Sequence, residues 1–351
     1  MLKKTLLAVA TSVACVLSSP VVFAQDHHEH DHAHHGHVHQ EKDVGEYKMI
    51  NGLRYYKTMS EAVPSKELMR IDIGAEPENV GGPKQDPKHT TGGLPMAFRP
   101  TVNKDEVWIL DSINGGLKLF KSGKLLKNIN IKEFCTVQDF AFSPDGSKIA
   151  FLNANTGKIY ITDDKGKLKT TISGYSYALS IEFENDKELL VLSPLSKGVA
   201  KVSVGGAPLG VFEGDQSLSN FSSEKGLWGI DYSNPTNAKL FVQKGSSPKV
   251  IAEFPFAEYK DVEYKVGKIY GLDSEGNVYF GLTACDPNGI IYRDRIYKCN
   301  QYGEILKELD VIDDPILSPE LPRHRIVCPD GDIMTFYSNE LVYAIRIYSM
   351  K

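Results

Sequence analysis

Residues 93–131, GLPMAFRPTVNKDEVWILDSINGGLKLFKSGKLLKNINI, and residues 135–173, CTVQDFAFSPDGSKIAFLNANTGKIYITDDKGKLKTTIS, follow one pattern. Each stretch runs through four apolar segments that are separated by short polar turns. The second segment ends in Leu-Asp or Leu-Asn, and the fourth follows Lys-Ser-Gly-Lys or Asp-Lys-Gly-Lys. The two stretches are offset by about 41 residues, the period of a four-stranded β-propeller blade. The pattern therefore predicts consecutive blades.

Weaker copies of the same unit follow along the chain. They cover residues 178–214, 217–254, 262–311 and 324–350, and the last of them ends after about three strands. The turn sequences DSEGN and NQYGE separate strands in the fifth unit. Long helical periodicity is absent, so the sequence predicts an all-β protein rather than an α/β protein.

The incomplete last unit needs a strand from elsewhere, because a propeller must close its ring. Residues 66–74, KELMRIDIG, alternate apolar and polar side chains and lie just before the first complete unit. We expect this segment to form the outer strand of the last blade, which leaves no exposed edge. The prediction is a six-bladed β-propeller over residues 66–351, closed by an N-terminal strand.

Three short stretches resemble bacterial six-bladed propellers of the NHL-repeat or TolB-like kind. They are the segment that begins with PMAF and runs through the strand pair at 95–129, DSEGNVYFG at 273–281 and CPDGDIMTFY at 328–337. The resemblance spans residues 66–351 and implies the fold. It indicates little about the ligand, because one propeller scaffold carries many functions.

The first 24 residues are typical of a secretory signal peptide. They combine a positively charged start, an apolar stretch over residues 6–17 and small residues that end at Ala24. We expect cleavage after Ala24 and a periplasmic or secreted protein. A lipoprotein anchored through Cys15 is the alternative.

A histidine-rich segment follows directly, and we expect residues 25–45 to form a disordered tail. Neutral imidazole binds zinc, copper or nickel, and a flexible chain without fixed geometry should hold such ions loosely. Protonation below about pH 6.5 should release them. A tail that only changes charge with pH is the competing interpretation. The predicted ligands are His27, His28, His30, His32, His34, His35, His37 and His39.

Residues 46–65 join the tail to the propeller as a linker or a short hairpin around Asn51-Gly52. The net charge is −5 and no dense basic stripe occurs, which argues against a nucleic-acid partner. No segment after the signal peptide is long and apolar enough to span a bilayer. We expect a monomer.

Four cysteines follow the predicted cleavage site. Cys285 and Cys299 bracket a hairpin sequence that suggests a disulfide, but a tight turn would place them too far apart for a bridge. Buried free thiols are the preferred interpretation for these two and for Cys135 and Cys328.

Acidic and histidine side chains near the start of the innermost strands form a candidate metal site at the mouth of the central channel. Carboxylates there could hold Ca²⁺, and imidazoles could add ligands for zinc or copper. The candidates are His89, Asp139, Glu182, Asp261, Glu263 and His324. The competing interpretation is that they are ordinary loop and surface residues.

The two histidines lie in Pro-rich loops, residues 74–93 and 313–323, that we expect on one face of the disc. We therefore predict a binding surface for a protein or a small ligand on that face, and a binding module as the function. A metal-dependent periplasmic hydrolase or lyase, similar to lactonases, is the alternative.

Overall fold

The computed structural model divides the chain into two units, residues 1–44 and 45–351, and all described residues belong to the second. The structure describes residues 47–50, 53–56, 63–82, 97–134, 136–193, 198–213, 226–243, 247–256, 259–312, 325–338 and 341–350. Across these ranges the regular elements are strands, apart from one turn of 3₁₀ helix, η2 (Lys132–Phe134). No helix in them is long and apolar enough to cross a membrane.

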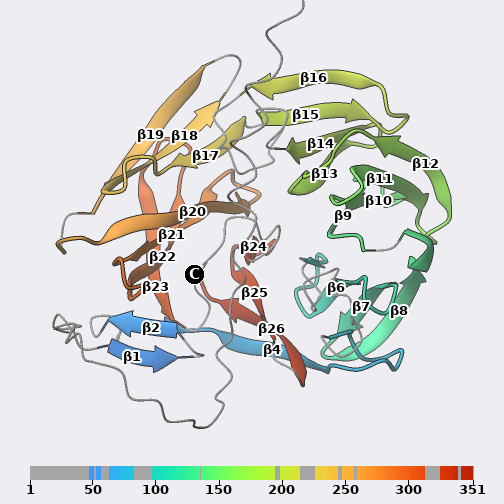
Figure 1. Cartoon of the computed structure of the whole chain (residues 1–351), viewed down its shortest axis with the longest axis horizontal. Coiled ribbons are helices and arrows are strands. Elements are labelled where there is room, and N and C mark those ends of the chain that lie inside the picture. Colours follow the sequence, from blue (N-terminus) through green and yellow to red (C-terminus); the bar gives the residue numbers. More distant parts are fainter. Residues whose placement is uncertain are drawn as a thin grey trace, which may run out of the picture. The chain divides into compact units, whose positions relative to one another are not determined.

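The strands form six sheets that follow one another in sequence order around a central space (Figure 1), and the consecutive strands of each blade pair antiparallel. The first three sheets have four strands each, numbered from the innermost to the outermost strand. Blade 1 is β5 (Phe98–Pro100), β6 (Glu106–Asp111), β7 (Gly116–Lys121) and β8 (Lys124–Asn130). Blade 2 is β9 (Asp139–Phe142), β10 (Lys148–Asn153), β11 (Lys158–Asp163) and β12 (Leu168–Ser173). Blade 3 is β13 (Ser180–Asn185), β14 (Glu188–Ser193), β15 (Gly198–Ser203) and β16 (Pro208–Glu213).

Blade 4 has three described strands: β17 (Leu227–Asp231), β18 (Asn237–Gln243) and β19 (Pro248–Pro255). The sequence unit at 217–254 places these three as the second, third and fourth strands of a blade. Its expected innermost strand falls in residues 214–225, outside the described residues.

Blade 5 is larger, because a segment from the N-terminal side joins its outer part. Its four principal strands are β20 (Glu263–Leu272), β21 (Val278–Cys285), β22 (Ile291–Cys299) and β23 (Ile305–Ile312). The hairpin of β1 (Tyr47–Ile50) and β2 (Leu53–Tyr56) meets β22 in parallel at Tyr55 and Ile291. β3 (Val63–Pro64) pairs in parallel with the end of β23. Tyr56 also stacks on Tyr292 of β22, with ring centroids 4.4 Å apart.

Blade 6 closes the ring with a strand from the other end of the chain. It consists of β24 (Arg325–Val327), β25 (Ile333–Ser338), β26 (Val342–Tyr348) and, outermost, β4 (Lys66–Asp72). β4 runs antiparallel to β26, with Met69 opposite Ile345 and Ile71 opposite Tyr343. Met69 and Ile71 are both buried, as the alternation in the sequence predicts. The predicted six-bladed propeller and its closure by an N-terminal strand are confirmed.

Glycines in the turns explain the recurring Gly-containing motifs of the sequence. In the turn before β12, the Asp163 carboxylate accepts hydrogen bonds from the backbone N–H groups of Lys165 and Lys167, and Gly166 has φ +86°. In the turn before β23, Gly303 has φ +91°, and a Cβ there would lie 2.3 Å from the carbonyl oxygen of Ile251 in blade 4. The backbone conformation and the close packing of neighbouring blades both favour glycine.

The hydrophobic core lies between adjacent sheets rather than in one central mass. Separate clusters of buried side chains join blade 6 to blade 1, blade 1 to blade 2, blade 2 to blade 3, blade 3 to blade 4, blade 4 to blade 5 and blade 5 to blade 6. Phe134, Phe140 and Phe151 dominate the contact between blades 1 and 2. Each blade is therefore stabilised mainly by its two neighbours.

Three described cysteines are buried free thiols: Cys285, Cys299 and Cys328. In the ladder of β21 and β22, Cys285 lies opposite Ile291 and Cys299 opposite Val278, so the two thiols sit at opposite ends of the strand pair. Cys285 and Cys299 are therefore too far apart for a disulfide within this hairpin, as the sequence predicted. Cys135 lies outside the described residues.

Candidate functional site

The connections between blades leave an outer strand and enter the next innermost strand, so antiparallel pairing brings all of them to one face, the connecting face. Three non-glycine residues in its described connections have positive φ: Thr136 (+37°), Tyr177 (+61°) and Asp261 (+63°). Thr136 is the most unusual, because its branched Cβ disfavours this backbone region. Such strain costs about 1–3 kcal/mol and is concentrated at functional sites in proteins. The strain marks this face as a candidate site.

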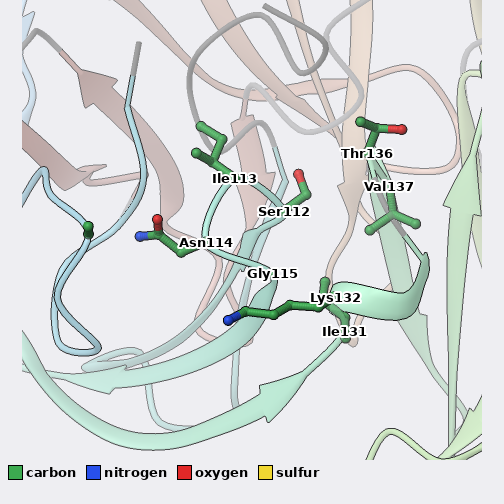
Figure 2. A pocket seen from close by; sticks show the side chains of 9 residues that line it. Ser112, Ile113, Asn114, Gly115, Ile131, Lys132, Thr136 and Val137 are labelled. Atoms are coloured by element: carbon green, nitrogen blue, oxygen red, sulfur yellow. The ribbon is translucent and has the colours of Figure 1, made fainter. Parts of the chain in front are cut away.

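A cavity of about 460 Å³ opens on the connecting face between blades 1 and 2 (Figure 2). Its walls come from the segment after β4, the β6–β7 turn, the end of blade 1 with η2, and the entry to β9. The lining residues are Ala75, Ser112, Ile113, Asn114, Gly115, Ile131, Lys132, Thr136 and Val137. The volume lies within the range of small-molecule sites. We call this cavity the connecting-face pocket.

The β6–β7 turn is held in place by hydrogen bonds to Asn114 and by a buried ion pair. The backbone N–H of Asn114 donates to the Asp111 carboxylate over 3.2 Å, and its side-chain amide donates to the carbonyl of Gly74 over 2.8 Å. The other oxygen of Asp111 pairs with Lys118 at 2.9 Å, and both side chains are almost fully buried. Lys118 also donates to the carbonyl of Asn79. The ion pair thereby fixes the wall that blade 1 and the segment after β4 share.

The blade 1–2 connection forms the opposite wall. Ile131 donates its backbone N–H to the carbonyl of Gly115 over 2.9 Å, and the Lys132 side chain extends across the pocket in the direction of Asn114 (Figure 2). A Cβ on Gly115 would lie 2.2 Å from Cγ of Lys132, so the glycine makes room for that lysine. Thr136 accepts a hydrogen bond from the amide of Asn153 over 3.4 Å. The lining combines neutral hydrogen-bonding groups, aliphatic surface and the cation of Lys132.

Two predicted metal ligands in blades 2 and 3 have protein partners. Asp139 is fully buried at the start of β9, and its carboxylate accepts the backbone N–H of Ile181 in blade 3 at 2.9 Å. Glu182 forms a two-point ion pair with Arg99 of blade 1, at 2.8 and 3.2 Å. Asp139 therefore links blade 2 to its neighbour blade 3, and Glu182 links blade 3 to blade 1.

The other two described candidates lie before and at the start of β20. Asp261 is exposed in the connection that precedes this strand, and Glu263 pairs with Lys265 at 2.7 Å. Within the described part of the chain, no group of three or more His, Cys, Asp or Glu side chains is close enough to hold a metal ion. His89, His324 and the eight tail histidines lie outside the described residues.

Three residues that shape this region were not predicted from the sequence: Arg99, Asn114 and Lys132. The Arg99 guanidinium reaches past blade 2, where its Nε donates to the carbonyl of Phe140 at 2.8 Å. Its signal in the sequence is a lone cation in the apolar strand MAFRP. The Asn-Gly pair in DSING indicates the turn that carries Asn114, but no sequence motif indicates a role for Lys132, which follows β8.

No protein-family model matches the chain, and no curated protein matches it. Solved structures resemble it at low identity. Hydrazine synthase of Kuenenia stuttgartiensis is 13% identical with a TM-score of 0.46, over 68% of this chain and 72% of that one. The RRP9 WD40 repeats are 11% identical with a TM-score of 0.45, over 72% of this chain and 94% of that one. The assignment of the fold rests on the strand pairing described above.

Proposed function

We propose that the chain is a secreted periplasmic binding module, a six-bladed propeller of the NHL-repeat or TolB-like kind. Its connecting face recognises a protein or a small ligand. Its histidine-rich segment, residues 25–45, binds divalent transition metal ions after removal of the signal peptide 1–24. In this proposal the protein acts as a monomer.

The connecting-face pocket is the observation that carries the proposal. Its neutral groups and the cation of Lys132 suit recognition of a polar ligand, and a buried ion pair keeps one wall rigid. Nearby carboxylates are already engaged: Asp139 accepts a backbone N–H and Glu182 pairs with Arg99. Acids committed in this way hold blades together, which favours binding over acid–base catalysis.

The tail carries the metal part of the proposal through its composition. Eight of the ten histidines of the chain lie within residues 27–39. Alternating histidines on a flexible chain can chelate one ion from successive imidazoles, with little selectivity among zinc, copper and nickel. Because protonated imidazole cannot bind a metal, affinity should fall as pH drops through about 6.5.

Calorimetric titration of zinc, nickel and copper into the chain that begins at Gln25 tests the tail. We expect binding at pH 7.5 to disappear when all eight tail histidines are replaced by glutamine. The matched control replaces His89 and His324 by glutamine and should bind as the wild type does. Unchanged stoichiometry and affinity in the eight-fold variant would contradict the proposal.

A ligand-observed NMR screen of small polar fragments tests the connecting face. Ser112→Trp fills the pocket from the β6–β7 turn, whereas Ser147→Trp adds the same side chain to the exposed turn before β10, outside the pocket. We expect fragments that bind the wild type to lose their signal with Ser112→Trp and keep it with Ser147→Trp. Fragments that bind both variants equally would refute this site.

A further inference from the structure

A second cavity, of about 440 Å³, lies where the innermost strands β5, β20 and β24 end. Each of these strands leads there into the turn to the second strand of its blade, so this cavity is at the opposite end of the blades from the connecting face. We call it the axial cavity. It is lined by Arg99, Pro100, Thr101, Val102, Leu272, Asp273, Ser274, Ile326, Val327, Cys328 and Pro329.

The charged groups of the axial cavity are neutralised within the protein. Arg99 is held by the two-point pair with Glu182 and by the carbonyl of Phe140. The carboxylate of Asp273 accepts hydrogen bonds from Asn277 and Tyr279 and lies 3.3 Å from Nζ of Lys298. A charged ligand would therefore find no uncompensated opposite charge in the wall, and it would lose hydration on entry.

Two further polar side chains of the wall, Thr101 and Cys328, are engaged within the protein or only weakly polar. The hydroxyl of Thr101 donates to the carbonyl of Asn103 over 3.0 Å and accepts the backbone N–H of the same residue over 3.1 Å. Burial raises the pKa of the Cys328 thiol to about 12, which keeps it protonated and weakly polar.

Apolar side chains supply the surface that a ligand would touch. Leu272, Ile326 and Val327 are half-buried at the cavity, and Val102 is 86% exposed beside them. Among the described strands, β5, β20 and β24 each pair with one strand only, so their other edges present backbone N–H and C=O groups toward the centre of the ring. An apolar wall with a few backbone donors and acceptors matches the usual design of small-molecule sites.

We propose that the axial cavity binds a small neutral molecule, with an apolar body and one or two amide or hydroxyl groups that bond the strand edges. The volume admits such a molecule, and the internally paired charges exclude ions. This site is separate from the connecting-face pocket, so two ligands can bind the ring from opposite ends.

Fluorescence titration with Nile red, a neutral apolar dye, tests the proposal on the chain that begins at Gln25. The test variant carries Val102→Lys and Leu272→Lys. The matched control carries Leu126→Lys and Leu168→Lys, at leucines 54% and 40% exposed on the outer strands β8 and β12. We expect one saturable site in the wild type and in the control, and at least tenfold weaker binding in the test variant.

The anionic dye anilinonaphthalene sulfonate provides the second arm and should bind at least tenfold more weakly than Nile red. Equal loss of binding in the test and control variants would overturn the proposal. So would equal affinity for the two dyes or the absence of a saturable site. If the double variant fails to fold by circular dichroism, Val102→Lys alone replaces it, since that side chain is 86% exposed.

Discussion

Arg325 and Asp294 form a fully buried ion pair between blades 6 and 5, and removal of the arginine should strongly destabilise the ring. The guanidinium lies 2.8 Å and 3.3 Å from the two carboxylate oxygens, and it donates to the hydroxyl of Tyr270 at 2.9 Å. Both charged side chains are 0% exposed. Arg325→Met leaves the carboxylate buried without its cation, which costs about 3–5 kcal/mol in known buried pairs.

Urea unfolding followed by circular dichroism measures this loss, and the free energy of unfolding should fall by about 3–5 kcal/mol. The double variant Arg325→Met with Asp294→Leu should recover most of it, because no charge is then left without a partner. The matched control is Arg70→Met, which removes an exposed two-point pair with Glu67 at 2.7 and 3.0 Å and should change stability little. If Arg325→Met is no more destabilising than Arg70→Met, the reasoning from burial is refuted.

Four further predictions concern closure, packing, thiols and pH. Ile71→Ala removes a buried side chain of the closing strand and should cost about 2–5 kcal/mol in the same unfolding assay; a loss below about 1 kcal/mol would contradict the role of β4. Gly303→Ala should destabilise more than Gly146→Ala, because both glycines have positive φ but a Cβ at Gly146 meets no atom within 4 Å. The three described cysteines, whose pKa burial raises to about 12, should not react with Ellman's reagent at pH 8 until urea unfolds the chain; rapid reaction of the native protein at these thiols would count against their burial. Burial raises the pKa of Asp273, but hydrogen bonds from Asn277 and Tyr279 outweigh burial, and the net pKa is lowered. The ionised carboxylate therefore stabilises the fold at a pH above the pKa of the unfolded chain, and this stabilisation is lost as the pH falls through the pKa of the folded protein. The stability gap between the wild type and Asp273→Asn should therefore shrink from pH 5 to pH 3, and a constant gap would argue against this carboxylate.

The repeat pattern was enough to predict the blades, because each blade folds from residues close in sequence. The last unit is one strand short, and KELMRIDIG alternates apolar and polar side chains. These two features were enough to predict the closing strand, although it lies far in sequence from the strand that it pairs with. The additional pairing of β2 and β3 with blade 5 had no sequence signal, since each contact involves only one or two residue pairs.

The candidate site was harder to predict, because its contacts join residues that are distant in sequence. The sequence around an aspartate at the start of an innermost strand does not distinguish a metal ligand from a structural hydrogen-bond acceptor. Only the fold places Asp139 beneath the backbone N–H of Ile181 and Glu182 beside Arg99. Pockets are set by such contacts between blades, so neither the connecting-face pocket nor the axial cavity could be read from the repeat.

Ring closure decides which loops share a face, and hydrogen exchange measured by mass spectrometry tests it most directly. β4 and β26 belong to opposite ends of the chain but to one sheet. The amides that pair them should therefore exchange on the same slow timescale and lose protection together as urea is added. If the peptide covering residues 66–72 exchanges as fast as an unfolded chain while β26 stays protected, the ring is not closed by this strand.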